Sequence, residues 1–139
     1  MKSTPARNLV KEKSADSEKI TINLGFVDLG QIDLLVSEGF YGNRSDLIRT
    51  AIRNQLASHA EVVKQAAARK MLVLGLQHFS ADDLRAVKAA KQRLRIRVLG
   101  LASIAHDVSP ELALATIESL DVLGALHASP AVKAALASR

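Results

Sequence analysis

Two short groups of polar side chains carry the donors and acceptors that could bind a partner. The first group alternates along one segment and consists of Lys19, Thr21 and Asn23. The second is consecutive and consists of Asn43, Arg44 and Ser45. Alternating ammonium, hydroxyl and amide groups suit a surface of mixed donors and acceptors. The Asn-Arg-Ser group precedes a helical pattern and suits an anion, because a helix start presents free N–H groups and a favourable dipole.

Other reactive side chains form no recognisable site in the sequence. There is no Gly-rich phosphate loop, no nucleophile motif and no paired-carboxylate cluster. The chain has no cysteine, and no two histidines lie at metal-ligand spacing on one helix. We therefore expect no enzyme, no metal and no cofactor, and we expect surface or loop positions for His59, His78, His106 and His127.

Composition indicates a folded protein with room for one ordinary domain or two small ones, since 48% of its 139 residues are hydrophobic. No apolar run approaches the roughly 20 residues of a membrane span, and no signal peptide is evident. With no cysteine present, we expect a cytoplasmic protein without membrane contact. Residues 61–97 hold nine of the basic side chains against three acidic ones, which favours either a polyanionic partner or a solvated face.

Residues 18–26 are predicted to form a strand, because apolar residues recur at every second position, as Ile20, Ile22 and Leu24. A lone strand leaves its backbone groups unpaired. Since no second strand lies nearby in the sequence, we expect the same strand of a second copy to pair with it as an antiparallel ribbon. The preceding residues 1–17 are polar and aperiodic, and we expect a flexible basic arm there.

Two helices are predicted after this strand. Apolar residues take helical spacing over residues 28–38, and Gly39 is placed to end that helix in a left-handed cap. Asn43 is a favourable N-cap, with an acidic residue three positions later, for a second helix that extends to about His59. Residues 61–70 are expected to form a helical connector.

The order strand, helix, turn, helix over residues 18–59 resembles the ribbon-helix-helix superfamily of Arc-, MetJ- and CopG-type repressors, whose members contact DNA with strands. The segments that carry the resemblance are KITINL and GNRSDLIRTAIRNQL. It implies a homodimer or higher homo-oligomer that binds double-stranded DNA, most simply as a transcriptional repressor. It also implies base contacts from Lys19, Thr21 and Asn23 in the major groove, and phosphate contacts from Asn43, Arg44 and Ser45.

Residues 71–139 show a different pattern, which resembles no family known to us. The tripeptide Val-Leu-Gly occurs three times, at residues 73–75, 98–100 and 122–124. Each copy is followed by a Ser-led helix start, at Ser80, Ser109 and Ser129. This predicts three βα units that form a small parallel sheet, with strands near residues 71–76, 94–101 and 120–126. A solenoid-like stack is one arrangement of such units.

The predicted fold class is therefore α+β, with a DNA-binding domain at residues 18–60 and an oligomerisation or regulatory domain at 71–139. Two other functions stay open, namely an antitoxin whose C-terminal segment binds a toxin, and a DNA segregation adaptor. The domain at 71–139 could then contact another protein. The basic run from Lys88 to Arg97 could be a second polyanion surface, although its latter part alternates like the wet side of a half-buried strand.

Overall fold

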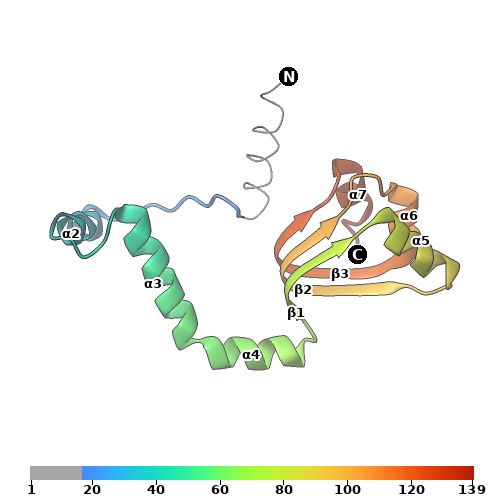
Figure 1. The fold of residues 1–139 in the computed structure, drawn as a ribbon, viewed down its shortest axis with the longest axis horizontal. Helices are drawn as coiled ribbons and strands as arrows, with labels where there is room; N and C mark the ends of the chain where they lie inside the picture. The colour runs from blue at the N-terminus through green and yellow to red at the C-terminus, as the bar shows by residue number, and fades with distance from the viewer. Residues whose placement is uncertain (1–16) are drawn as a thin grey trace, which may run out of the picture. The chain divides into compact units, whose positions relative to one another are not determined.

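The computed structural model describes residues 17–139, which contain six helices and one three-stranded sheet (Figure 1). These residues divide into two compact units, one spanning Lys19–Ala66 and the other containing Ala67–Arg139. The mixture of helices with a parallel sheet agrees with the predicted α+β class. Except for Ser17, the predicted N-terminal arm lies outside the described residues.

The N-terminal unit begins with a segment that is neither helix nor strand, up to Gly25. Helix α2 (Phe26–Ser37) follows, so the predicted end of the strand at Phe26 is wrong. Gly25 holds the extended N-cap conformation, and Asp28 lies in the first turn, where a carboxylate is favourable. Among residues 17–139 the segment before α2 has no partner strand, and the ribbon remains a prediction.

Helix α2 ends as the sequence predicts, at a glycine in the left-handed conformation. Gly39 has a φ of 86°, and its N–H donates to the carbonyl of Val36 at 3.1 Å. The N–H of Phe40 donates to Leu35 at 3.0 Å, which completes a Schellman motif. Helix α3 (Arg44–Ser58) and helix α4 (Ala60–Arg69) follow, separated at His59.

The C-terminal unit consists of three strand–helix pairs in sequence order. They are β1 (Val73–Phe79) with α5 (Ala81–Ala89), β2 (Leu94–Ile104) with α6 (Pro110–Thr116), and β3 (Ile117–His127) with α7 (Pro130–Ala135). The strands are parallel in the order β1-β2-β3 (Figure 1). The three Val-Leu-Gly copies lie in exact register, as the rows Val73–Val98–Val122, Leu74–Leu99–Leu123 and Gly75–Gly100–Gly124. The repeat therefore corresponds to one βα unit.

Two predicted strand starts are wrong for local reasons. Strand β1 begins at Val73 because Met71 takes a left-handed φ of 57°, while Leu72 donates to the carbonyl of Ala67 at 2.8 Å. Those two residues thus cap α4 instead of entering the sheet. Strand β3 begins at Ile117, directly after α6 and three residues earlier than predicted.

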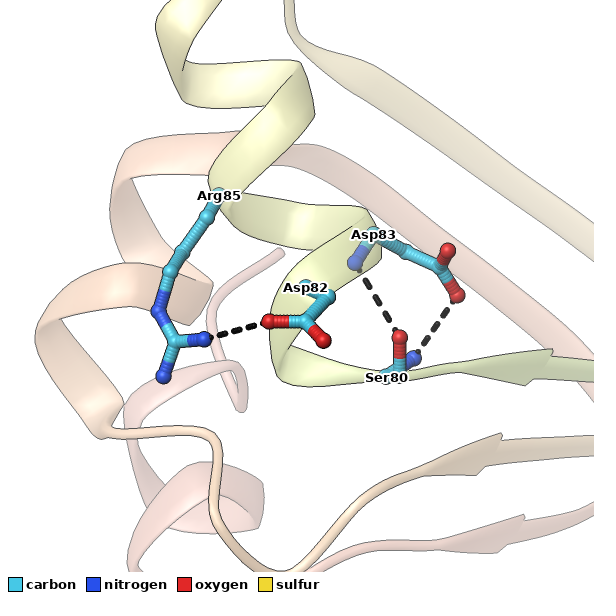
Figure 2. Close-up of polar contacts among 4 residues, drawn as sticks. All are labelled: Ser80, Asp82, Asp83 and Arg85. Carbon is cyan, nitrogen blue, oxygen red and sulfur yellow. Dashed lines mark hydrogen bonds and ion pairs between the residues drawn. The ribbon is translucent and has the colours of Figure 1, made fainter.

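The predicted Ser-led helix starts are confirmed. Ser80, Ser109 and Ser129 each accept a hydrogen bond from the backbone N–H three residues later. Figure 2 shows the first of these, where the Asp83 carboxylate accepts in return from the Ser80 N–H at 3.0 Å. The hydrogen bonds with Ser80, first of all the one from its backbone N–H, lower the pKa of Asp83. The neighbouring Asp82 and Arg85 form an ion pair at 2.7 Å, one turn of helix apart.

The core of the C-terminal unit lies between the helices and one face of the sheet. Alternate residues of β2 are buried, among them Ile96, Val98 and Ala102, and they pack in one cluster with helix residues such as Leu84 and Val132. The residues between them, including Leu99 and Leu101, do not belong to that cluster. The helices therefore cover one face of the sheet.

The glycine row brings neighbouring strands unusually close. A Cβ at Gly100 would lie 2.2 Å from the carbonyl oxygen of Gly75, and one at Gly124 would lie 2.0 Å from that of Gly100. Both glycines also have φ values that other residues rarely adopt, at 141° and 122°. Gly100 and Gly124 are thus required by the close approach of the neighbouring strand in addition to their φ values.

Candidate nucleic-acid interface

The first group of predicted contact residues lies on the irregular segment before α2. Lys19, Thr21 and Asn23 are all exposed. The apolar residues that alternate with them are exposed too, by 74% at Ile20 and 59% at Ile22. The segment thus has a polar and an apolar set of side chains, and neither is covered in the single chain.

The second group lies where α3 begins, and Asn43 fixes this point. Its backbone is extended, and its side-chain oxygen accepts a hydrogen bond from the N–H of Asp46 at 2.8 Å. The Asp46 carboxylate accepts in turn from the N–H of Gly42 at 2.9 Å. This is a reciprocal cap like the predicted capping box, except that the returned bond comes from one residue earlier.

Arg44 forms an ion pair that the sequence did not predict. Its guanidinium donates two hydrogen bonds of 2.7 Å to the two carboxylate oxygens of Asp33, which is the bidentate geometry that arginine favours. The pair lowers the pKa of Asp33 and raises that of Arg44, in each case first through the hydrogen bond between them. Both side chains are about half exposed, so the pair ties α2 to the start of α3 while the remaining guanidinium N–H groups face solvent.

The backbone at the same point can still bind an anion. Among the hydrogen bonds of the described residues, none is donated by the N–H of Arg44 or Ser45 to a protein acceptor. Both residues are exposed, at the positive end of a 15-residue helix. The geometry therefore suits a phosphate oxygen, held by N–H groups that are free of other partners within residues 17–139.

The second basic stretch is largely engaged within its own unit. Arg95 forms an ion pair with Glu118 of β3, which lowers the pKa of that carboxyl. Arg97 donates to the carbonyl oxygen of Lys70, and Arg93 donates to that of Leu114. These contacts favour the interpretation of a solvated strand side over a second polyanion surface.

The histidines show no metal site within the described part of the chain. His78 lies 3.1 Å from the Ser103 hydroxyl, and His59 lies 3.2 Å from Gln55. Residues 17–139 contain no group of three or more His, Cys, Asp or Glu side chains that could hold a metal ion. In that same range, no helix combines the length and the apolar character needed to span a membrane.

The described residues contain, in order, an irregular segment, a helix, a tight loop, an Asn-capped helix and, after α4, the βα units. The model of the ribbon-helix-helix transcriptional regulator family matches residues 15–133, and the chain belongs to that family. The resemblance found over residues 18–59 is thereby confirmed. The match also includes the βα units, so they are part of the family's common sequence. No curated protein and no solved structure matches the chain.

Proposed function

We propose that this regulator is a dimeric, sequence-specific repressor that binds the major groove with an antiparallel ribbon. The ribbon consists of the segment around residues 19–25 from two copies. As a bacterial-type DNA-binding protein, it would act in the cytoplasm. Family membership supports a DNA-binding regulatory role. The repressor activity, the dimer and the contacts below are the proposed part.

One observation carries the dimer. Between Ser17 and Ala66, all of which the structure describes, no residue is buried. The exposed large apolar residues in this range are Ile20, Ile22, Leu24, Phe26, Val27, Leu34, Leu35, Phe40, Ile52, Leu56, Val62 and Val63. Fully burying one such side chain is worth about 1.5–3 kcal/mol, so a single copy leaves a large apolar contribution to stability unrealised. A second copy supplies both the apolar cover and the missing strand partner.

DNA contacts then divide into two kinds. Once Ile20 and Ile22 are covered, the alternating Lys19, Thr21 and Asn23 face outward, where their donors and acceptors meet base edges. At the start of α3, the N–H groups of Arg44 and Ser45 meet a phosphate, which is common to every sequence. Asn43 fixes that loop through its hydrogen bond with Asp46.

Arg44 has two roles in this proposal. It holds α2 against α3 through Asp33, and its remaining N–H groups add positive charge beside the phosphate. A loss of DNA binding in Arg44→Ala would not by itself distinguish these two roles. Asp33→Asn separates them, because it breaks the ion pair and leaves the guanidinium charge in place.

The antitoxin alternative receives less support from the structure. Antitoxin tails are usually short, charged and folded only on their toxin, whereas the C-terminal unit has its own core, with Leu84, Val98 and Ile117 fully buried. We assign that unit an oligomerisation or regulatory role.

Titration of DNA duplexes tests the proposal, with a cognate duplex selected from a random pool and a scrambled duplex as the control. Thr21→Ala and Asn23→Ala should each lose about 1–3 kcal/mol on the cognate duplex and little on the scrambled one. Arg44→Ala should weaken both and flatten the salt dependence by about one unit of slope. Asp33→Asn should keep the wild-type salt slope.

Two results would contradict the proposal in different ways. Equal losses on both duplexes for Thr21→Ala and Asn23→Ala would mean that the ribbon does not recognise bases. Sedimentation of the wild-type chain as a folded monomer at micromolar concentration would remove the dimer.

A further inference from the structure

The second face of the C-terminal sheet is apolar and uncovered by its own helices. Two register rows make up its centre, namely Leu74–Leu99–Leu123 and Leu76–Leu101–Ala125. None of these six residues belongs to the core cluster. The exposed fraction is 75% at Leu74, 67% at Leu76 and 49% at Leu123. We call these six residues the leucine face.

The charges around the leucine face do not oppose contact between two copies of it. At one end Arg95 is paired with Glu118, and Arg97 lies in register with Asp121. At the other end lie His78, Ser103 and His127, which share one register row. The centre of the face is uncharged, and each arginine has a carboxylate beside it. Strand β1 likewise carries no charged residue from Val73 to Phe79, so its free edge lacks the charges that normally protect an edge strand.

Parallel sheets in proteins are almost always covered on both faces. The leucine face is therefore a surface that requires an occupant. The dimensions of the whole sheet face that contains it limit the choice. Three strands span about 14 Å and the seven residues of β1 about 23 Å, which gives this sheet face a flat footprint of roughly 320 Å². A freely diffusing protein usually needs about 800 Å² per partner for a stable complex.

A small apolar surface can nevertheless bind a partner that is already tethered nearby. The dimer proposed above would tether a second C-terminal unit, which raises its effective concentration above that of a freely diffusing protein. That unit carries an identical face, and identical faces can pack about a two-fold axis as a sheet sandwich about 10 Å thick. The observations thus favour a second copy over an unrelated protein.

We propose that the leucine face packs against the leucine face of the second copy, joining the two C-terminal units of one dimer. This inference rests on the proposed dimer of the DNA-binding unit. It gives the C-terminal unit a definite task, since the second contact adds buried apolar area to the dimer of the DNA-binding unit. The pairing is isologous, so every residue of the face serves in both copies.

This chain allows a direct test because its 139 residues include no cysteine, which makes any introduced thiol unique. Leu74→Cys places a thiol on the leucine face, and Ala115→Cys places one at an exposed position in the last turn of α6 as the control. In the dimer, maleimide should label the Leu74→Cys thiol at least roughly tenfold more slowly than the Ala115→Cys thiol. Dilution below the dimer dissociation constant should restore it.

A second variant measures the contact energetically. Leu74→Glu combined with Leu123→Glu changes two exposed side chains, and should raise the dimer dissociation constant at least roughly tenfold while circular dichroism stays unchanged. A matched control is Ala115→Glu, at an exposed position of α6. The inference would be overturned if the wild type is a dimer, the Leu74→Cys thiol is labelled as fast as the control thiol, and the double Glu variant keeps the wild-type dimer dissociation constant. That outcome would leave the proposed function intact. A wild-type monomer would instead remove the proposed function itself.

Discussion

The two units of this chain achieve burial in opposite ways. The C-terminal unit packs its helices on one sheet face and buries eleven hydrophobic residues, among them Leu84, Val98 and Val132. The N-terminal unit has helices of good local geometry, with defined caps at Gly39 and Asn43, yet none of the residues 17–66 is buried. Well-formed secondary structure therefore does not by itself make a core.

The difference in burial arises from where the extended segments of each unit find their hydrogen-bond partners. Strands β1, β2 and β3 find their partners within 25 residues, because each βα unit returns the chain beside the previous strand. The segment before α2 has no other strand in its unit, so its hydrogen bonds and its apolar side are left without partners among the described residues. The C-terminal unit is complete on one face, whereas the N-terminal unit has the surface that the proposed dimer would cover.

The largest effect is expected at the glycine row, which exists only in the C-terminal unit. Gly100→Ala forces a Cβ to 2.2 Å from the Gly75 carbonyl oxygen, where neither strand can move without breaking the sheet. It should lower the free energy of unfolding by roughly 4 kcal/mol or more. Gly75→Ala meets no atom within 4 Å and should cost only the backbone strain, about 1–3 kcal/mol. Urea unfolding of both variants checks this, and equal losses would refute the close-approach explanation.

A pair of identical substitutions compares the two units directly. Leu84 is fully buried, so Leu84→Ala should cost about 2–5 kcal/mol at any protein concentration. Leu56 is 60% exposed in the single chain, so Leu56→Ala should destabilise mainly through the dimer, with a loss that changes with concentration. Thermal unfolding over a hundredfold concentration range measures both. A concentration-independent loss below about 0.5 kcal/mol for Leu56→Ala would indicate an ordinary surface residue.

The smallest effect is expected at the helix cap drawn in Figure 2. Ser80→Ala removes the acceptor for the Asp83 N–H and should cost about 1 kcal/mol. The pKa of Asp83 is lowered in the folded chain, so its contribution is complete above its unfolded pKa of about 4 and disappears as the pH falls through the folded value. The Ser80 N–H, which lowers this pKa most, is kept in Ser80→Ala, so both proteins should lose this contribution in acid and their stability difference should change little with pH in thermal melts. Asn43→Ala, a cap of the same chemistry in the N-terminal unit, should in addition weaken DNA binding.

Much of this architecture could be predicted from the sequence, because the relevant forces act over a few residues. The Ser-led helix starts, the Asn43 cap and the cap at Gly39 each depend on hydrogen bonds between residues three to five apart. The Val-Leu-Gly repeat predicted three βα units because one strand and one helix have a nearly constant combined length. The alternation of Ile20 and Ile22 with polar residues also predicts a ribbon, which requires a second copy and stays a prediction.

Other features were decided only by the tertiary structure. No local pattern links Asp33 to Arg44, eleven residues away, because their ion pair depends on how α2 lies against α3. The leucine face is apolar like the buried face, and only the side on which the helices pack separates them. The role of Gly100 was likewise invisible, since the carbonyl that excludes a side chain there belongs to another strand. Sequence spacing determines which residues share a face, whereas packing determines which face is covered.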